Sequence, residues 1–73
     1  MTNVYTAIIE REDEIYVSLC PELDIASQGS TIEEAKENLT EAVELFFETA
    51  DETEIQERTH VESYVTKFEV TVG

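Results

Sequence analysis

The fold of this chain depends most on residues 20–47, CPELDIASQGSTIEEAKENLTEAVELFF. Thr31 is a good helix N-cap, because its hydroxyl can accept a hydrogen bond from the backbone N–H of Glu34, whose carboxylate can reach back to the Thr31 N–H. We expect the helix to run from there to about residues 48–50. Its apolar positions recur at spacings of three and four and form one stripe: Ile32, Ala35, Leu39, Ala42, Val43 and Phe46. In so short a chain, every other segment must pack with this stripe.

The length of the chain indicates one domain. Residues 1–73 are expected to form it, with a core of marginal size. The one cysteine, Cys20, cannot form a disulfide within the chain, and the Cys and His content offers no structural metal site. Stability is therefore expected to come from regular packing or from association, such as a homodimer. The lone cysteine and the lack of a signal segment or a membrane-length apolar run predict a soluble, cytoplasmic protein.

Charge is the strongest feature of the composition. Eighteen acidic residues oppose four basic ones, which gives a formal net charge of -14 at pH 7. Many of the acids fall between Glu33 and Glu57, where Lys36 is the only base. Direct binding to nucleic acid is disfavoured, because such affinity comes from Lys and Arg neutralising phosphates. Two interpretations stay open: an acidic face that steers a basic partner protein, or a helix whose outer side is simply solvated.

Segments rich in β-branched and aromatic residues are the predicted strands. They are Val4–Arg11, Glu14–Cys20, Ile25–Gln28 and Val61–Val72. Glu12 and Asp13 are expected to form the first turn, and Pro21 ends the second strand because proline cannot donate to a ladder. Residues 51–60 are mostly polar and are expected to be a linker, because their acids would lie unfavourably at the negative C-terminal end of the helix.

The resulting element order, β-β-β-α-β, predicts an α+β fold. The first strands are expected to form an antiparallel meander, and the last to lie parallel to the first after a right-handed crossover. This gives a mixed four-stranded sheet of order 3-2-1-4 with one helix on one face. The face under the helix is expected to carry Ala7, Ile9, Val17, Leu19, Phe68 and Val70. The other face is expected to carry Ile8, Tyr16 and Cys20 among Thr6 and Ser18. A half-apolar face without cover suggests association.

A series of short motifs follows in order between about residue 4 and residue 48. They are Tyr5-Thr6-Ala7-Ile8-Ile9-Glu10-Arg11-Glu12, Tyr16-Val17, Cys20-Pro21-Glu22-Leu23, Ser27-Gln28-Gly29, Thr31, Glu33-Glu34-Ala35, Glu37-Asn38-Leu39 and Glu41-Ala42. Each motif alone is weak, but the compound pattern is specific. It resembles the N-terminal domain of HicB-like antitoxins, and this resemblance implies a partial RNase H-like fold with the same β-β-β-α-β order.

The resemblance also implies a function. HicB antitoxins bind and mask small basic HicA toxins, which are ribonucleases of double-stranded-RNA-binding-domain type that act on mRNA. The acidic composition agrees with such a partner. Typical HicB proteins continue into a C-terminal domain that binds operator DNA. Because this chain stops at Gly73, the expectation of DNA-binding autoregulation is not carried over to it.

Catalytic interpretations have little support in the residues. Two-metal nuclease chemistry of RNase H type needs converging carboxylates, and Glu10 and Glu69 are the nearest candidates, without a recognisable metal-binding spacing. His60 has no neighbour that would complete a nucleophilic set, and Cys20 lacks the electropositive surroundings of a reactive thiol. We therefore expect no enzyme activity and no cofactor or metal.

The predicted function is that of a binding protein: a HicB-like antitoxin that neutralises a small basic HicA-type toxin. The alternative is a small dimeric structural or ligand-binding domain with no toxin partner. The expected partner-binding residues are helix glutamates and two sheet residues: Glu33, Glu37, Glu41, Glu44, Glu48, Tyr16 and Ile8. Leu45 and Phe47 lie off the centre of the apolar stripe, either as the edge of the core or as anchors for a partner.

Overall fold

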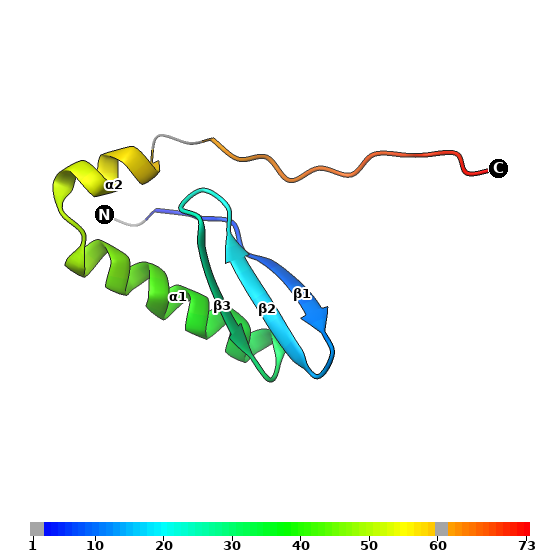
Figure 1. Ribbon diagram of the computed structural model, residues 1–73, viewed down its shortest axis with the longest axis horizontal. Helices are drawn as coiled ribbons and strands as arrows, with labels where there is room; N and C mark the ends of the chain where they lie inside the picture. The colour runs from blue at the N-terminus through cyan, green and yellow to red at the C-terminus, as the bar shows by residue number, and fades with distance from the viewer. Residues whose placement is uncertain (1–2, 60–61) are drawn as a thin grey trace.

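The computed structural model describes residues 3–59 and 62–73. Within these ranges the elements follow in this order: β1 (Ile8–Glu12), β2 (Ile15–Cys20), β3 (Ile25–Gly29), α1 (Ile32–Thr49) and α2 (Glu52–Thr59). The strands pair in the order β1-β2-β3, each antiparallel to the next, and α1 lies across one face of the sheet (Figure 1). The predicted meander of the first strands and the helix over one face are confirmed.

A two-residue loop joins β1 to β2, one residue later than the predicted turn. Glu12 and Ile15 form the last pair before the loop, and Asp13 within it adopts a φ of 57°. Asp is among the residues that tolerate this left-handed region best. In this register Ile9 lies opposite Ser18. Because residues directly opposite each other share a face, odd-numbered residues of β1 lie beside even-numbered residues of β2.

The register shows that the predicted faces of β2 were wrong. Ser18 is fully buried and donates a hydrogen bond of 2.9 Å from its Oγ to the carbonyl oxygen of Ala35 in α1. The face under the helix therefore carries Ile9, Tyr16, Ser18, Cys20, Ile25, Ser27 and Gly29. The open face carries Ile8, Ile15, Val17, Leu19 and Ala26. The prediction followed hydrophobicity, but the strand pairing and the need for small side chains beneath α1 decided the faces.

The N-terminal end of α1 lies very close to the sheet. A Cβ added to Gly29 would come within 2.5 Å of the backbone nitrogen of Ala35, a distance that real Cβ atoms do not adopt. The Ala35 side chain is itself fully buried. Only small residues fit at this contact, so Ser18, Gly29 and Ala35 fix the distance between the two layers.

The layers separate towards the C-terminal end of α1, and the larger core side chains fill the space. Cys20, Leu23 and Leu39 are buried there, with exposed fractions of 1%, 1% and 4%. Partly buried residues pack around them: Tyr5, Ile25, Val43, Phe46 and Phe47. The core is small, as expected for a chain of this length.

The predicted start and end of the helix are confirmed. Thr31 is the N-cap, and its Oγ1 accepts a hydrogen bond of 3.0 Å from the Glu34 N–H. The Glu34 carboxylate returns to the N–H of Ser30, at 3.2 Å, rather than to that of Thr31. At the other end α1 stops at Thr49, and Ala50 adopts an extended conformation.

The prediction of a linker over residues 51–60 was wrong, because α2 occupies most of that range. Asp51 starts this helix: its Oδ1 accepts a hydrogen bond of 2.8 Å from the Glu54 N–H. Glu52 and Glu54 thus lie in the first turn of a second helix, where the helix dipole favours acids, and not in the last turn of the first. His60, the only histidine, lies outside the described residues.

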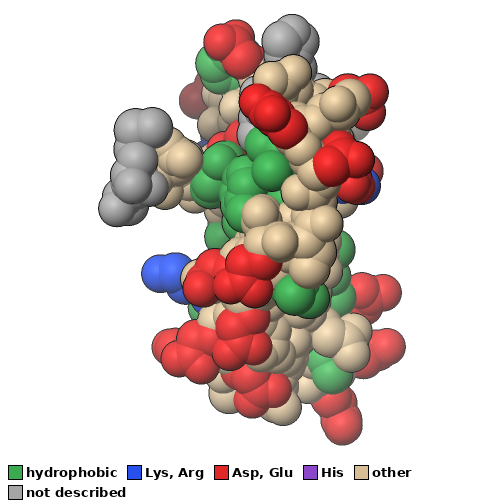
Figure 2. All heavy atoms as spheres, turned by 90° about the vertical axis from the view of Figure 1, so that its left-hand side faces the viewer, with side chains coloured by type: hydrophobic (Ala, Val, Ile, Leu, Met, Phe, Trp, Pro, Cys, Tyr) green, Lys and Arg blue, Asp and Glu red, His purple; other side chains and the backbone are tan. Residues whose placement is uncertain are grey.

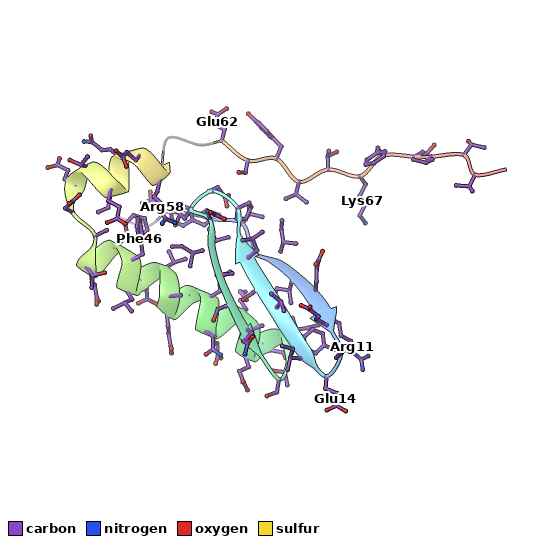
Figure 3. The ribbon with its side chains drawn as sticks, in the orientation of Figure 1. Arg11, Glu14, Phe46, Arg58, Glu62 and Lys67 are labelled. Carbon is purple, nitrogen blue, oxygen red and sulfur yellow. The ribbon has the colours of Figure 1, made fainter. Side chains whose placement is uncertain are left out.

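The end of α2 is attached to the body of the molecule. Arg58 donates a hydrogen bond of 2.8 Å to the carbonyl oxygen of Leu23, in the loop between β2 and β3. Its guanidinium also lies over the ring of Phe46, 5.4 Å from the ring centroid. Figure 3 shows Arg58 directed from α2 back towards Phe46 on α1. These contacts hold the C-terminal end of α2 against the β2–β3 loop and α1.

The predicted fourth strand, and with it the mixed four-stranded sheet of order 3-2-1-4, is wrong for this chain. Among the described residues the sheet contains β1, β2 and β3 alone. Residues 62–73 form an extended segment that runs away from α2 and ends far from the helices (Figure 1). Phe68 and Val70, predicted beneath the helix, have exposed fractions of 84% and 68%. We call residues 62–73 the C-terminal arm.

Candidate functional site

Five glutamates form a row along the outer side of α1. Glu33, Glu37, Glu41, Glu44 and Glu48 are separated by three or four residues, so they share one face of the helix, and all are exposed. The first four line a shallow hollow together with Lys36 and Thr40. Acidic side chains are also prominent on the side of the molecule shown in Figure 2, where they surround a hydrophobic patch. We call the five glutamates the acidic row.

The acidic row costs helix stability. Like charges four residues apart on a helix destabilise it by roughly 0.2–0.5 kcal/mol per pair. Glu33 and Glu34 in the first turn are favoured by the helix dipole, but the last turn of α1 contains no basic residue. If the outer side of α1 served only to keep the helix soluble, alternating Glu and Lys would do so without this repulsion. The row is therefore a candidate binding surface for a basic partner.

Leu45 adds an apolar side chain to the exposed part of α1. Its exposed fraction is 57%, whereas Phe47 is half-buried and packs against the core. The ring of Phe47 stacks on Tyr5, with ring centroids 5.9 Å apart, and meets Phe46 edge-on. The sequence allowed two roles for Leu45 and Phe47, either the edge of the core or anchors for a partner. In the structure Phe47 lies at the edge of the core, whereas Leu45 is exposed and can contact a partner.

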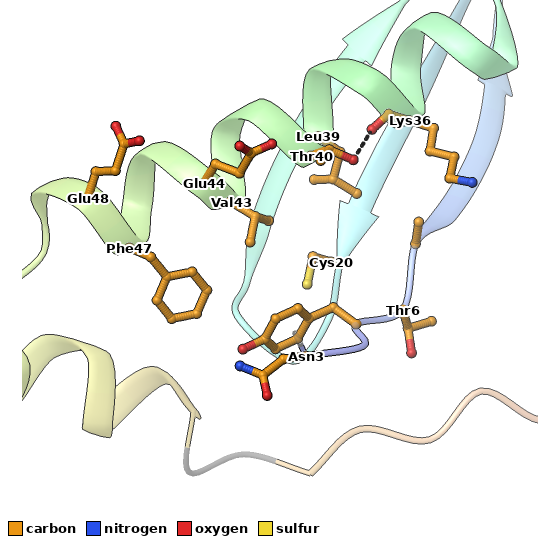
Figure 4. Close-up of a pocket in the computed structure, with 12 residues that line it drawn as sticks. Asn3, Thr6, Cys20, Lys36, Leu39, Thr40, Val43, Glu44, Phe47 and Glu48 are labelled. Atoms are coloured by element: carbon orange, nitrogen blue, oxygen red, sulfur yellow. Dashed lines mark hydrogen bonds between the residues drawn. The ribbon is translucent and has the colours of Figure 1, made fainter. Parts of the chain in front are cut away.

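A groove runs between α1 and the segment that precedes β1. Its volume is about 580 Å³, and Figure 4 shows Leu39, Val43 and Phe47 directed into it from the helix. The remaining lining residues are Asn3, Tyr5, Thr6, Ala7, Cys20, Lys36, Thr40, Glu44 and Glu48. Its floor is apolar and its rim is charged. We call it the α1–β1 groove.

The groove exists because α1 lies off-centre over the sheet. The helix makes its closest and most extensive contacts with β3 and only slight contact with β1. On the β3 side, Asn38 donates a hydrogen bond of 2.7 Å from its side chain to the Gln28 carbonyl oxygen. The outer edge of β3 is thus covered by the helix, while the side chains of α1 that face β1 have space beneath them.

A carboxylate holds the segment that forms the floor of the groove. Glu22 accepts hydrogen bonds from the Thr6 N–H, at 3.0 and 3.1 Å, and from the Thr6 hydroxyl, at 2.7 Å. Desolvation acts to raise the pKa of Glu22, but these hydrogen bonds to Thr6 outweigh it and hold the pKa below its usual value. Glu22 therefore stays ionised and ties the N-terminal segment to the end of β2.

Cys20 has the properties of a core residue. Its side chain is 1% exposed, and its Sγ lies 3.6 Å from the Glu22 carboxylate. Burial raises the pKa of the Cys20 thiol, and the charge of Glu22 raises it further. A thiol in these surroundings stays protonated at neutral pH and is a poor nucleophile.

The structure separates the two sheet residues predicted to bind a partner. Ile8 is half-buried on the open face of the sheet, as predicted. Tyr16 lies on the opposite face, because it pairs with Gly29 beneath α1. The acidic row lies on the outer side of α1 and is therefore separated from Ile8 by the helix and the sheet. These seven residues do not form one continuous surface.

The nuclease candidates are also apart. Glu10 lies on the open face of β1, whereas Glu69 lies on the C-terminal arm, which has no place in the sheet of its own chain. Over residues 3–59 and 62–73, no three His, Cys, Asp or Glu side chains gather in a way that could hold a metal ion. No helix in the described part of the chain is long and apolar enough to cross a membrane.

Comparison with known proteins gives one informative similarity. The chain is 49% identical over 47 residues to UPF0150 protein ssr1765 of Synechocystis sp. (strain ATCC 27184 / PCC 6803 / Kazusa). The match covers 62% of this chain and 60% of that protein, so the chain spans about three fifths of its relative's length. No protein-family model matches the chain, and no solved structure matches it. The chain is thus similar to a UPF0150 protein.

The sequence alone located the acidic row but missed the groove. Tyr5 and Phe47 were visible as aromatic residues on two predicted elements, but nothing in the pattern indicated that they stack. The position of α1 over β3, which opens the groove, depends on Gly29 and Ser18 allowing close contact. Gly29 and Ser18 were therefore the sequence features from which the position of α1 could have been predicted.

Proposed function

We propose that this chain is an antitoxin-type binding protein that neutralises a small basic toxin of the HicA type and is not itself an enzyme. The observation that carries the proposal is the acidic row on α1. It is supported by the motifs between residues 4 and 48 that resemble HicB-like antitoxins, and by the similarity to a UPF0150 protein. A ribonuclease that binds RNA needs a basic surface, and a row of carboxylates can compete for it.

The proposed docking surface is the outer side of α1. The acidic row supplies long-range attraction, which raises the rate of encounter, and Leu45 supplies an apolar contact within the same surface. Ile8 and Tyr16 fall outside this surface, since one lies on the open face of the sheet and the other beneath the helix. A partner of similar size would contact one side of this two-layer molecule, and the charged side suits a basic protein best.

The test is co-expression and pull-down with the product of the adjacent gene, for which a small basic protein is the expected result. The triple variant Glu37→Gln, Glu41→Gln, Glu44→Gln removes charge from the centre of the acidic row. We expect its association rate at low salt to fall by about tenfold or more, with a weaker dependence on salt, because steering by opposite charge is lost.

A matched control removes the same charge elsewhere. The triple variant Glu10→Gln, Glu12→Gln, Glu14→Gln neutralises three carboxylates of the β1–β2 hairpin, which are exposed and belong to the sheet and not to α1. Its association rate should stay within about twofold of the parent rate. If both triple variants slow association equally, only net charge matters, and the docking surface proposed for α1 is wrong.

A second candidate function is a small dimeric structural or ligand-binding domain without a toxin partner. The α1–β1 groove favours it, because its volume of about 580 Å³ lies in the range of small-molecule pockets. The co-expression experiment separates the two candidates. A salt-sensitive complex with the basic neighbour supports the antitoxin, and a protein that binds only itself or a small molecule supports the second candidate.

A further inference from the structure

The C-terminal arm has the sequence pattern of a strand but pairs with no strand in the described part of its own chain. Residues 62–73 read ESYVTKFEVTVG, in which apolar and polar residues alternate. Its apolar side chains are exposed: Tyr64 at 82%, Val65 at 63%, Phe68 at 84%, Val70 at 68% and Val72 at 89%. Tyr64 and Thr66 donate hydrogen bonds to neighbours within the arm, Glu62 and Lys67. So much exposed apolar surface on one extended segment indicates that another surface covers it.

The outer edge of β1 is a free sheet edge. The sheet order places β2 on one side of β1 and no strand of the described chain on the other. The Thr6 N–H is directed to Glu22 at the end of β2, so by strand alternation the backbone groups of Ala7, Ile9 and Arg11 point outward. An edge of this kind can accept an added strand. The edge of β3 is less open to an added strand, because Asn38 of α1 already occupies its Gln28 carbonyl.

The α1–β1 groove lies beside this free edge and beneath α1. An added strand along β1 would place every second side chain in the groove, against Leu39, Val43 and Phe47. In an extended arm every second side chain lies on the same side, so Tyr64, Phe68 and Val70 share one side. The groove's volume of about 580 Å³ is large enough for several such side chains.

We propose that the C-terminal arm of one chain adds as a strand to the β1 edge of a second copy and fills its α1–β1 groove, and that the exchange is reciprocal. The result is a symmetric dimer in which each groove is completed by the other chain's Tyr64, Phe68 and Val70. A two-fold arrangement satisfies both free edges and both arms at once. The proposal does not depend on a toxin partner.

The place of the arm in its own chain favours a second copy as the occupant. The arm takes no part in the described sheet of its own chain, it contributes no residue to the lining of its own groove, and its apolar side chains are exposed. Twelve residues in extended conformation span about 40 Å, which is enough to reach across a neighbouring molecule of this size.

Charge also favours this arrangement. The arm has two acids and one base, so it is nearly neutral in a chain of net charge -14 and is the part best able to approach another copy. With Phe68 in the groove, Lys67 lies on the opposite side of the arm. That side corresponds to the open face of the sheet of the second copy, which carries Glu10 and Glu12 on β1.

The test uses the full chain. Sedimentation equilibrium should give twice the chain mass of 8.3 kDa. In a mixed sample of isotope-labelled and unlabelled protein, isotope-filtered NMR should detect contacts between Phe68 of one chain and Val43 or Phe47 of another. A monomer at millimolar concentration would overturn the proposal. Contacts found only within one chain, or a dimer whose arms stay free, would also overturn it.

Matched variants test the assigned side of the arm. Phe68→Glu places a charge in the groove and should weaken dimerisation on the order of 100-fold or more, since burial of an unpaired charge is costly. Thr71→Glu adds the same charge on the opposite side of the arm and should change the dissociation constant about threefold or less. Equal effects from both variants would contradict the assignment. Should Phe68→Glu also unfold, the interchain contacts of the parent protein decide the question.

Discussion

At the scale of single residues, the contact between sheet and helix depends on three small side chains. Gly29 lies against the backbone of residues 34 and 35, Ser18 donates to the Ala35 carbonyl, and Ala35 is fully buried. Larger residues would lift α1 from β3 and change the width of the groove on its other side. The same contact therefore controls both the stability of the domain and the shape of its candidate site.

Gly29→Ala tests this contact. The added Cβ would meet the Ala35 nitrogen at 2.5 Å and the Glu34 carbonyl carbon at 2.8 Å, so the helix must shift. We expect the free energy of unfolding to fall by about 1–3 kcal/mol in urea denaturation at fixed protein concentration. Gly73→Ala is the control, because a Cβ there meets nothing within 4 Å. An unchanged midpoint for Gly29→Ala would show that the layers can separate without cost.

At the scale of elements, α1 and α2 differ in how they are stabilised. α1 buries Ala35 and Leu39 against the sheet, whereas α2 is short and polar and depends on the Asp51 cap and the Arg58 contacts. Helices of this length are marginal without such support. Of the two helices, α2 is therefore the more easily opened.

Asp51→Ala should open α2 locally. The variant loses the hydrogen bond to the Glu54 N–H, a cap worth about 1 kcal/mol. Protection of α2 amides from hydrogen exchange should fall by about fivefold, while the amides of α1 stay protected. Thr31→Ala removes the corresponding cap of α1 and should instead lower protection across the sheet and α1 together, because that helix belongs to the core. Equal loss throughout the chain after Asp51→Ala would show that α2 unfolds with the core.

At the scale of the whole molecule, the net charge of -14 affects the two proposed associations in opposite directions. Two copies repel each other, and the nearly neutral arm limits but does not remove that repulsion. A basic partner is attracted by the same field. Salt screens both effects, since the Debye length falls from about 30 Å at 0.01 M to about 3 Å at 1 M.

We therefore expect added salt to strengthen the dimer and to weaken the complex with a basic partner. Sedimentation equilibrium of the chain alone, and binding kinetics with the neighbouring basic protein, measured over the same range of NaCl, check the two signs. If both associations weaken with salt, charged contacts rather than apolar burial hold the dimer, and the arm does not fill the groove as proposed.

The sequence by itself determined the local elements of this protein. The Thr31 cap and the apolar stripe defined α1, and alternation of apolar residues with turn signals defined β1, β2 and β3, because these features depend on neighbours a few residues apart. The acidic row followed directly from helical spacing. Residues 51–60 were misassigned because Asp51, which looked unfavourable as the end of one helix, is the cap of the next.

Only the tertiary structure decided which face of the sheet lies under the helix and where the last segment goes. Ser18, and not the more apolar Val17 or Leu19, lies under the helix, because strand pairing fixes the side on which Ser18 lies and the close approach of α1 requires a small residue there. The arm has the sequence pattern of a strand, but it takes no part in the described sheet, so local pattern and final position differ. Periodicity specifies the conformation of a segment, whereas its partner is set by contacts between residues far apart in the chain.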